Sequence, residues 1–539
     1  MATRYDCVVV GSGHAGSCAA FSAAEAGCKK VLLVDVCPPE WVGGNGYFTA
    51  GGFRTVHGGL KDLLPIVNDV SAKQAEIIDM TAYTRDDFLG DIMRLGGGKP
   101  DAVLAGAVVD ASRDTIAWLA GSVGIPFAFS FHRQAYVVEG RQKFWGGMVL
   151  CTDDGGKGLI AAHQRALARA KVDVWFNCPA LEITMQNGVV SGLVVEKNGE
   201  RMHLPTRAVV LAAGGFEASP RLREKYLGTG WERAIAHHIT NKSILSSFTA
   251  QLKVEKQVTG SSSPPRLARV SELLLLYQGY IPTSRRTGDW AGCHSTCWDA
   301  DAPTQGDRHL TNQYTKSGYP LGIMVNSAGK RFVDEGEDHR NYTYAKFGRA
   351  ILLQPGGYAF QVWDSKVIGM LRKEEYADDV VKRIFADSVE ELAEKLAEKG
   401  LHAKDEFVQT INEFNLAVKA YKAEVPDASW NPAVKDGLTT QSSAKQLALP
   451  KSNWALTIDQ APFMAVKVAC GVTFTFGGIS IEPETAGVIS AKTGKVIPGL
   501  FCTGEMVGLF HGNYPGGSGL TAGAVFGRRA GREAAKLMA

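Results

Sequence analysis

The chain has 539 residues, of which 45% are hydrophobic and 21% are charged, a composition typical of globular domains and not of disordered or fibrous chains. The formal net charge is +3, which gives no support to nucleic-acid binding. At roughly 150 residues per domain, this length predicts about two to four domains. Glycine is in excess, with 61 residues, or about 11% against a usual figure of about 7%. The excess has no collagen-like period, so it predicts tight turns and close backbone approaches.

The N-terminus shows no charged segment followed by an apolar one, so we expect no signal peptide and a cytoplasmic protein. No run reaches the length of about 18 apolar residues that a spanning helix needs, so we expect no transmembrane segment. The ten cysteines are scattered along the chain, and a disulfide framework is not expected in so long a chain. Cys293 and Cys297 flank His294, but no further ligands follow at nearby spacing. We therefore expect two reduced thiols there and no metal site.

The first 35 residues predict a βαβ unit. Residues 5–10 form a short apolar strand, residues 11–16 a glycine turn, and residues 17–26 an Ala-rich helix, and a second apolar strand over 31–34 ends at Asp35. Such a unit opens an α/β domain with a parallel sheet. Further elements are predicted as a helix over 159–170, strands over 172–176 and 207–213, and a β-meander over 181–204.

The glycine turn has the spacing of a dinucleotide-binding loop. Gly11 permits a tight turn, Gly13 lets the backbone approach a pyrophosphate, and Gly16 allows close packing of helix and strand. The N-terminus of the following helix supplies N–H groups and a positive dipole for phosphates. Asp35 ends the second strand, where a carboxylate would hold ribose hydroxyls. The alternative is a βαβ turn that binds no nucleotide.

The stretch over residues 235–286 differs from the rest of the chain. It is rich in Ser, Thr and Lys, and it contains seven basic and two acidic residues, a local charge of +5 that leaves −2 for the remainder. Without interleaved aromatic residues this local charge gives little support to nucleic-acid binding. We interpret the stretch as an atypical basic insertion or linker.

The remaining sequence predicts an inserted region and a return to the first domain. Residues 287–455 contain two amphipathic helices, over 388–399 with Ser388 as its cap and over 405–424. Residues 456–539 are again rich in glycine and have α/β texture. We therefore expect residues 1–234 and 456–539 to build one nucleotide-binding domain, with 287–455 as an inserted capping domain.

Two more glycine runs favour a flavin dinucleotide over a nicotinamide one. Residues 43–52 follow soon after the second strand, and residues 499–520 precede a predicted small-residue helix over 522–535. The N-terminus of that helix would point at the carbonyl edge of a flavin ring and stabilise its reduced anion. The alternative is a pair of packed glycine-rich loops.

These runs resemble the fumarate reductase/succinate dehydrogenase flavoprotein superfamily. The resemblance is carried by VVVGSGHAGSCAA, GGNGYFTAGG, RAVVLAAGGFEAS, GKRFVDEGEDHRNYTYAKFGRA and LFCTGEMVGLFHGNYPGGSGLTAGAVFGRRAG. It implies an α/β fold, in which a Rossmann-like FAD-binding domain carries a capping domain that closes over the substrate. It also implies an FAD-dependent dehydrogenase or reductase that acts on a C–C bond beside a carboxylate, with a small carboxylic acid substrate and a separate electron acceptor or donor.

The resemblance assigns cofactor roles to matching positions. The ADP half of FAD would be held by the dinucleotide loop and its acid, the flavin ring would lie over the second glycine run, and the ribityl chain and ring edge would meet the C-terminal run. The corresponding residues are Gly11, Gly13, Gly16 and Asp35 for the first part, Gly43, Gly44 and Asn45 for the second, and Glu505, Gly519 and Leu520 for the third. Members with covalent flavin have a histidine where this chain has residues 46–49, without one, so noncovalent FAD is expected.

Three residues are candidates for the active site. Arg340 matches the arginine that fumarate reductases use for proton delivery. Because a guanidinium is nearly always protonated, we favour a carboxylate clamp for it, the alternative being a surface arginine paired with Glu335 or Asp338. His294 matches a substrate-binding histidine, although it could be purely structural. Tyr514 stands where fumarate reductases have a carboxylate-binding arginine.

Two departures from the family pattern decide the expected substrate. Residues 473–476 lack the second histidine of fumarate reductases, and Tyr514 replaces their arginine, so two carboxylate holders are missing and fumarate itself is not expected. The runs after Asp338 and Asn513 are most similar to the tricarballylate dehydrogenase branch, which predicts a tricarballylate-type di- or tricarboxylic acid. The alternatives are a fumarate-, urocanate- or ketosteroid-type flavin enzyme, or a flavin-binding protein without turnover, because the usual Asn-Thr-Gly-Asp-Gly run after Arg233 is absent.

Overall fold

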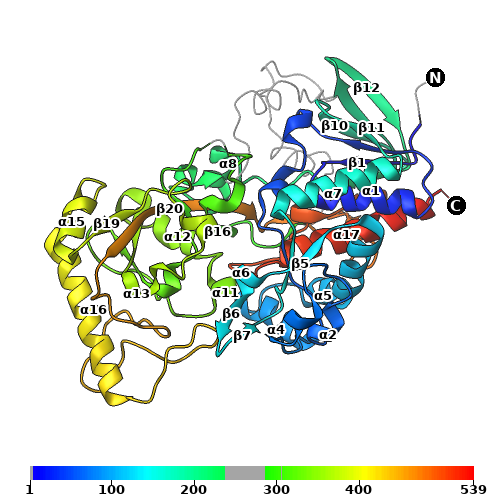
Figure 1. The fold of residues 1–539 in the computed structure, drawn as a ribbon. Coiled ribbons are helices and arrows are strands. Elements are labelled where there is room, and N and C mark those ends of the chain that lie inside the picture. The colour runs from blue at the N-terminus through cyan, green and yellow to red at the C-terminus, as the bar shows by residue number, and fades with distance from the viewer. Residues whose placement is uncertain (1–3, 237–285, 305, 539) are drawn as a thin grey trace, which may run out of the picture.

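The structure is a computed structural model that describes residues 4–236, 286–304 and 306–538. The basic stretch predicted over 235–286 lies almost wholly outside the described residues. The described chain forms two lobes, and helices α1 (His14–Glu25) and α17 (Ser518–Lys536), from opposite ends of the chain, lie side by side in one of them (Figure 1).

The lobe that contains both termini is built on a six-stranded sheet in the order β22-β23-β13-β1-β2-β9. Four of its five neighbouring pairs are parallel, and the edge strand β22 is antiparallel to β23. The strands are β1 (Cys7–Val10), β2 (Val31–Val34), β9 (Asp173–Trp175), β13 (Ala208–Leu211), β22 (Gly487–Ile489) and β23 (Val496–Cys502). All residues of β1, β2 and β13 are buried, as expected for a parallel sheet that is covered on both faces. The predicted α/β fold class is confirmed.

Helices pack closely around this sheet. Helix α17 lies against α1. A Cβ on Gly527 would lie 2.7 Å from the Ala15 carbonyl oxygen, and one on Gly531 would lie 2.5 Å from the Ala19 carbonyl oxygen. The small residues of the C-terminal helix are therefore required by this contact. The other long helices of the lobe are α4 (Arg85–Leu95), α5 (Ala102–Trp118) and α7 (Gly155–Arg169).

Three helices begin before the predicted positions. Those expected from residues 17, 159 and 522 start at His14, Gly155 and Ser518. Each unpredicted first turn contains glycine, which has low intrinsic helix propensity. Tertiary packing therefore extends these helices to the edge of the sheet, where their N-termini meet the site described below.

The predicted meander is present as β10 (Ala180–Gln186), β11 (Val189–Lys197) and β12 (Glu200–Pro205), paired antiparallel. Smaller elements complete this lobe and its junction with the second one. They are β3 (Gly52–Phe53), β4 (Ile78–Asp79), β5 (Phe127–Phe129), β6 (Ala135–Val138), β7 (Arg141–Phe144), β8 (Leu150–Thr152), β15 (Arg286–Thr287), β21 (Gly478–Ile479), α2 (Leu60–Leu63), α3 (Ala72–Ala75), α6 (Phe131–Gln134) and α8 (Pro220–Leu227).

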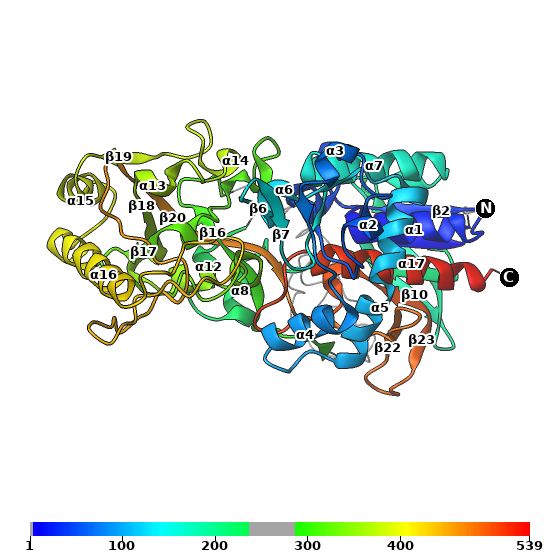
Figure 2. The same cartoon turned by 60° about the horizontal axis from the view of Figure 1, so that its bottom comes forward.

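The second lobe is organised around the long strand β20 (Phe463–Thr475), which runs from the outer part of this lobe toward the first (Figures 1 and 2). The strands that pair with it or extend its sheet are β14 (Ile235–Ala236), β16 (Cys293–Asp299), β17 (Ile323–Asn326), β18 (Tyr358–Trp363) and β19 (Ile384–Ala386). Short helices of this lobe are α11 (Arg340–Thr343), α12 (Phe347–Leu352), α13 (Ser365–Ile368) and α14 (Lys373–Tyr376). The predicted boundary at residues 455/456 precedes β20, and the division into domains stays a prediction.

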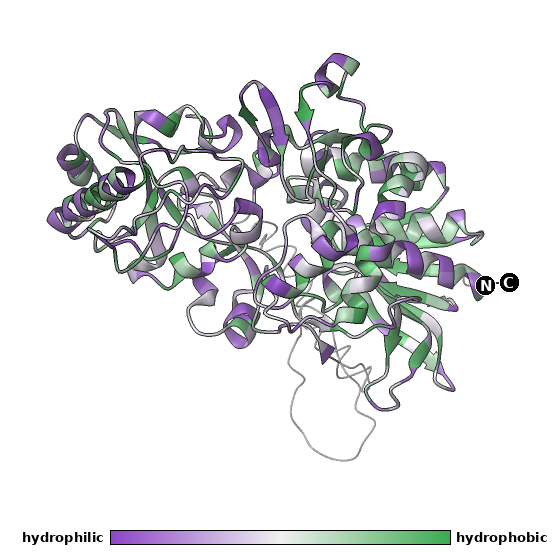
Figure 3. Cartoon of the chain, turned by 90° about the horizontal axis from the view of Figure 1, so that it is seen from below, coloured by the Kyte–Doolittle hydropathy of each residue, from purple (hydrophilic) through white to green (hydrophobic). Residues whose placement is uncertain are grey.

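The two predicted amphipathic helices of this lobe are α15 (Val389–Ala397) and α16 (Lys404–Glu424). Ser388 caps α15, because its hydroxyl accepts a hydrogen bond from the Glu391 backbone N–H at 3.0 Å. The apolar face of α16, with Phe407, Ile411 and Phe414, is buried. Hydrophobic colour is concentrated on the strands inside each lobe and hydrophilic colour on the outer helix surfaces (Figure 3). In the described parts of the chain, no helix combines the length and apolarity needed to span a bilayer.

Candidate active site

A cavity of about 400 Å³ is lined by residues of both lobes, a size typical of ligand sites. Eleven of the thirteen residues singled out from the sequence line it: Gly11, Gly13, Asp35, Gly44, Asn45, His294, Arg340, Glu505, Tyr514, Gly519 and Leu520. The other two are packed against protein. A Cβ on Gly16 would lie 1.9 Å from the Gly11 carbonyl oxygen, and one on Gly43 would lie 2.6 Å from Ile160 Cγ1.

The dinucleotide-type turn forms one end of the cavity. Gly11 has φ +109°, and a Cβ there would lie 2.3 Å from the Ala212 carbonyl oxygen, so only glycine fits. Gly13 is different: its backbone is extended, and a Cβ would meet only the Gly43 carbonyl oxygen at 3.5 Å. The space beside Gly13 therefore belongs to the cavity, where a phosphate could approach the start of α1.

Asp35 lies at the end of β2, as predicted. Its Oδ2 accepts a hydrogen bond from the Ser12 N–H at 2.6 Å, and its Oδ1 accepts one from the Cys37 N–H at 2.9 Å. These bonds hold the carboxylate at the rim of the turn, in the position expected for a ribose-binding acid.

Helix α17 also starts at the cavity. Gly517 precedes it in the left-handed region with φ +85°, and Gly519 and Leu520 lie in its first turn and line the cavity. The first-turn N–H groups of a helix have no intrahelical acceptor and carry the positive end of its dipole. Because the helix starts four residues earlier than predicted, these groups belong to a helix N-terminus and not to a loop.

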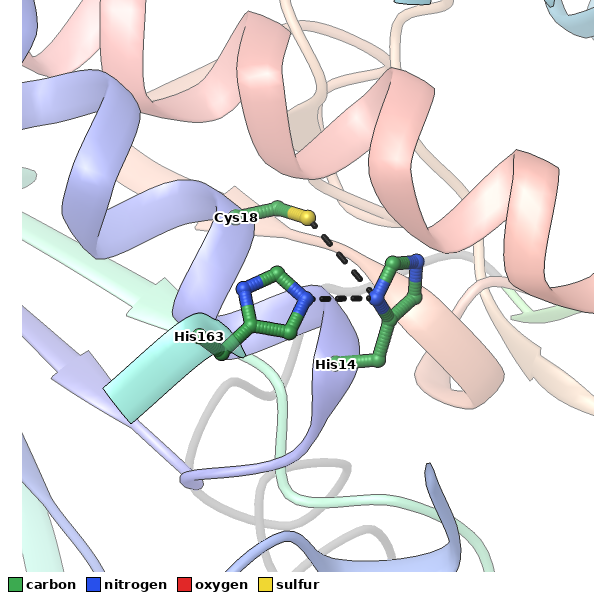
Figure 4. Close-up of side chains that lie close together, drawn as sticks. All are labelled: His14, Cys18 and His163. Atoms are coloured by element: carbon green, nitrogen blue, oxygen red, sulfur yellow. Dashed lines mark hydrogen bonds between the residues drawn. The ribbon is translucent and has the colours of Figure 1, made fainter. Parts of the chain in front are cut away.

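A histidine pair ties the three helices around the cavity together (Figure 4). His14 Nε2 lies 3.0 Å from the Leu520 carbonyl oxygen, and His14 Nδ1 lies 2.8 Å from His163 Nε2. Since a carbonyl only accepts, His14 donates from Nε2, and its Nδ1 accepts from His163. Burial lowers the pKa of His14 to about 4 and that of His163 well below its usual value, so both are neutral at pH 7. The pair links α1 and α7 to the first turn of α17.

The same cluster includes Cys18, whose Sγ lies 4.0 Å from His14 Nδ1, and the donor atoms of the three side chains lie within 4.8 Å of one another. The distance of 2.8 Å between the two histidine nitrogens is that of a hydrogen bond. Two nitrogen ligands on a tetrahedral zinc ion would lie about 3.3 Å apart, from Zn–N distances of about 2.0–2.1 Å. The geometry favours a hydrogen-bonded link, and the absence of a metal stays a prediction. Cys293 does not join His294 in a cluster, because neighbouring strand residues point to opposite faces.

Two carboxyl groups meet in the cavity wall. Glu505 Oε1 accepts hydrogen bonds from the Thr475 backbone N–H at 2.7 Å and hydroxyl at 2.9 Å. Burial, together with the charge of Glu217 and a hydrogen bond to it, raises the pKa of Glu505 well above its usual value. A hydrogen bond between two carboxyl groups needs one proton, so the pair holds a proton at a pH where isolated carboxyl groups are ionised.

This pair predicts a pH effect on stability. The folded pair keeps a proton that the unfolded chain releases above the ordinary carboxyl pKa, so its contribution to stability is lost as the pH rises. We expect the unfolding free energy of wild type relative to Glu217→Gln to fall between about pH 5 and pH 8, as measured by urea unfolding of the FAD-free proteins. Glu413→Gln, at an exposed position of α16, is the control and should show no such trend. A constant difference between wild type and Glu217→Gln over this range would contradict the prediction.

Arg340 begins α11 and faces the cavity from the second lobe. Its guanidinium donates to Ser317 Oγ at 3.1 Å and to the Arg133 carbonyl oxygen. The two acids that could have paired with it are engaged elsewhere: Glu335 with Arg331 at 2.5 Å, and Asp338 with Arg94 at 3.0 Å. Arg340 is therefore held by neutral oxygens, and its charge faces the cavity.

A second cation and a buried acid support Arg340. Arg133 also lines the cavity, and its guanidinium lies 3.7 Å from Glu375, which forms a 3.0 Å ion pair with Arg372. Ser317 donates from its N–H and hydroxyl to Glu375 at 2.9 and 2.5 Å. Burial alone would raise the pKa of Glu375, but the two arginines and these hydrogen bonds lower it. The ionised Glu375 thus orients both Ser317 and Arg133.

His294 lies on β16, opposite Phe474 of β20 in the register of the sheet, and only 4% of it is exposed. Its ring centre lies 4.7 Å from that of Tyr344, 5.4 Å from Phe474 and 5.1 Å from Tyr514. Among the described residues, neither of its ring nitrogens has a hydrogen-bond partner. Burial lowers the pKa of His294 to about 3, so the ring is neutral and free to bind a ligand in the cavity.

Sequence reasoning missed several residues of this site. His14 stands inside the glycine turn, where a polar side chain at a position facing the sheet was a visible signal. Glu217 lies in the RAVVLAAGGFEAS run, whereas Arg133 and Glu375 belong to none of the quoted runs. These segments are far apart in the chain, so only the fold brings the three residues to this site. Tyr344 follows Arg340 by one helical turn, a spacing that places both side chains on one face.

The cavity fits FAD. Gly13 and Gly44 leave backbone exposed to open space, where a Cβ has no atom closer than 3.5 Å. One part of the cavity offers a helix N-terminus and a carboxylate for a nucleotide, and another part offers a second helix N-terminus for an electron-rich ring. These features are those that a flavin dinucleotide requires at its two ends.

Comparison with known proteins decides the family. The FAD binding domain family model matches residues 6–257 and 294–520. This chain belongs to the FAD binding domain family. It binds FAD, and it is an FAD-dependent oxidoreductase of the fumarate reductase flavoprotein superfamily.

Individual relatives agree with this assignment. The chain is 27% identical over 537 residues to a probable fumarate reductase of Shewanella frigidimarina, covering 98% of this chain and 74% of the relative. It is 26% identical over 550 residues to the urocanate reductase of Eggerthella lenta, covering 100% of this chain and 75% of the relative. The structure of the open conformation of a flavocytochrome c3 fumarate reductase has the same fold, with a TM-score of 0.65 and 24% identity, covering 99% of this chain and 78% of that one.

Proposed function

We propose that this FAD-binding protein oxidises or reduces a C–C bond beside a carboxylate, and that Arg340 clamps the carboxylate. The observation that carries the proposal is the position of Arg340 in the cavity that the FAD-binding loops also line. Two of its N–H groups bind Ser317 and the Arg133 carbonyl, which leaves the others of the planar fork for a carboxylate.

The chain's own residues would orient the substrate. Arg340 and Arg133 supply positive charge where the substrate carboxylate gains electron density during the reaction. Because Ser317 and Glu375 hold these arginines in place, little reorganisation is needed when the substrate binds. The aromatic residues beside His294 exclude water from the reacting carbons.

When bound, FAD would supply the redox chemistry, the transfer of a hydride between the flavin and a substrate carbon. We propose that the cofactor is held noncovalently, by the turn at residues 11–16, Asp35, Asn45, Glu505 and the start of α17.

The sequence motifs and the relatives favour different classes of carboxylate substrate. The sequence motifs predict a tricarballylate-type acid, whereas the relatives are named for fumarate and urocanate. The relatives favour the second class, an unsaturated carboxylate that is reduced. A ketosteroid-type substrate is less well supported, because the cavity presents two arginines.

The proposal is tested with purified, FAD-loaded protein under anaerobic conditions. After chemical reduction of the flavin, unsaturated carboxylates should restore its visible absorbance, and saturated carboxylates should bleach the oxidised flavin if oxidation is the favoured direction. The same compounds as methyl esters are the matched control, because they lack the charge that Arg340 would bind. Flavin that responds to no carboxylate, or to acids and esters alike, would overturn the proposal.

A further inference from the structure

We infer that the substrate carries a single carboxylate next to the reacting bond and a neutral, planar ring on the other side of that bond, as in a 3-arylacrylate. This inference rests on the proposed function and names the class of substrate for the same site. It is carried by the different chemistry of two groups of residues that line the cavity.

The first group is cationic. Arg340 and Arg133 both line the cavity, and the nearest acid, Glu375, is completely buried behind Ser317. Among the described residues that line the cavity, Arg340 and Arg133 are the two arginines, and there is no lysine. One carboxylate therefore finds its partners in this group.

The second group is an aromatic wall, which we define as His294, Tyr344, Phe474 and Tyr514, all of which line the cavity. The ring centres of Phe474 and Tyr514 lie 5.0 Å apart, and both rings lie edge-on to one another at 82°. The hydroxyl groups of Tyr344 and Tyr514 lie 3.0 Å apart, hydrogen-bonded to each other. Phe510 also lines the cavity, and its ring centre lies 5.1 Å from that of Tyr514. The tyrosines are fixed by α11 and by the loop before α17, so the wall is a built surface.

The aromatic wall is uncharged at neutral pH. Burial lowers the pKa of His294 to about 3. Burial also raises the pKa of Tyr344, and it raises that of Tyr514 well above the usual value, with a further contribution from Tyr344. Arg54 lies near both tyrosines, but it does not line the cavity and is paired with Asp91 at 3.3 Å. A second carboxylate would therefore be placed against neutral rings, at a large desolvation cost.

A planar ring suits this wall for two reasons. Aromatic rings gain packing energy from offset or edge-on contact with other rings. The two ring nitrogens of His294, which have no partner among the described residues, offer one donor and one acceptor to a polar substituent on the ligand.

The first test compares substrates on the FAD-loaded wild-type enzyme. Cinnamate and 4-hydroxycinnamate represent arylacrylates, while fumarate and tricarballylate represent di- and tricarboxylates. We expect kcat/KM for the better arylacrylate to exceed that for fumarate by at least about 100-fold. Efficient turnover of fumarate or tricarballylate with little of either arylacrylate would overturn this inference and leave the proposed function standing. Turnover of none of the four compounds would overturn the inference, and the ester control above then decides on the proposed function.

A second test changes the wall. Tyr514→Arg places a cation in this wall, and we expect it to shift the kcat/KM ratio of fumarate to arylacrylate toward fumarate by about 10-fold or more. Tyr514→Phe is the matched control, because it keeps the ring and removes only the hydroxyl group, and the ratio should then stay in favour of the arylacrylate. An unchanged ratio in Tyr514→Arg would contradict the inference.

A binding measurement keeps the inference testable if Tyr514→Arg does not fold. Perturbation of the flavin spectrum of the wild-type enzyme by 3-phenylpropanoate and by succinate gives their dissociation constants without turnover. We expect 3-phenylpropanoate to bind at least about 10-fold more tightly. Tighter binding of succinate would contradict a neutral aromatic wall.

Discussion

Replacing Arg340 by Ala is expected to lower kcat/KM for the best carboxylate substrate by about 10³-fold, which corresponds to about 4 kcal/mol of lost transition-state stabilisation. The guanidinium faces the cavity without an acidic partner of its own, so the substrate carboxylate would lose its main charge-assisted contact. Steady-state kinetics under anaerobic conditions measure the loss. The FAD content should remain that of the wild type, since Arg340 comes from the second lobe and the dinucleotide turn from the first.

Two further variants separate charge from geometry at this position. Arg340→Lys keeps the charge but not the planar fork, and we expect it to recover only a small part of the activity. Arg383→Ala removes an arginine of the same lobe that pairs with Asp378 at the surface, and it should retain nearly full activity. Arg340→Ala with wild-type kcat/KM would exclude the proposed clamp.

Replacing Gly13 by Val is expected to abolish FAD binding while leaving the fold intact. The extended backbone of Gly13, with φ −68° and ψ 178°, suits a β-branched residue, and a Cβ there meets no protein atom closer than 3.5 Å. The added methyl groups would instead fill the space where a phosphate approaches the turn. We expect the dissociation constant for FAD to rise by at least about 100-fold, or about 2.7 kcal/mol, while the far-UV circular dichroism stays unchanged.

Gly90→Val is the matched control for this variant. Gly90 lies within α4, and a Cβ there meets no atom within 4 Å. Because the helix propensity of Val is slightly higher than that of Gly, the same chemical change should be tolerated here. FAD titration followed by flavin fluorescence compares the two variants. Gly13→Val that binds FAD as tightly as the control would show that the nucleotide does not pass this turn.

Short local patterns were sufficient to predict much of the nucleotide-binding lobe. The βαβ unit follows from an apolar strand, a glycine turn and a second strand ending in Asp35, because each of these signals lies within a few residues of the next. Gly16 was predicted to allow close packing and does so against Gly11. The early starts of α7 and α17 were missed, because glycine in their first turns weakens the local signal.

The substrate end of the cavity could be predicted only in part. His294, Arg340 and Tyr514 were recognised through motifs, and the fold brings all three to one cavity. The motifs pointed to a tricarboxylate, whereas the rings packed around His294 argue for a neutral group. That difference depends on Phe474 lying opposite His294 across two paired strands and on Tyr344 meeting Tyr514, contacts between segments more than 150 residues apart in the chain.

By itself, the sequence determined the α/β class and the dinucleotide-type turn, because glycine spacing and strand patterning act over short distances along the chain. Only the tertiary structure decided the electrostatics of the site. It placed Glu217 beside Glu505, Glu375 behind Arg340 and Arg133, and neutral rings around His294. Burial and charge depend on which groups surround an atom in space, and those neighbours come from segments that the sequence pattern does not connect.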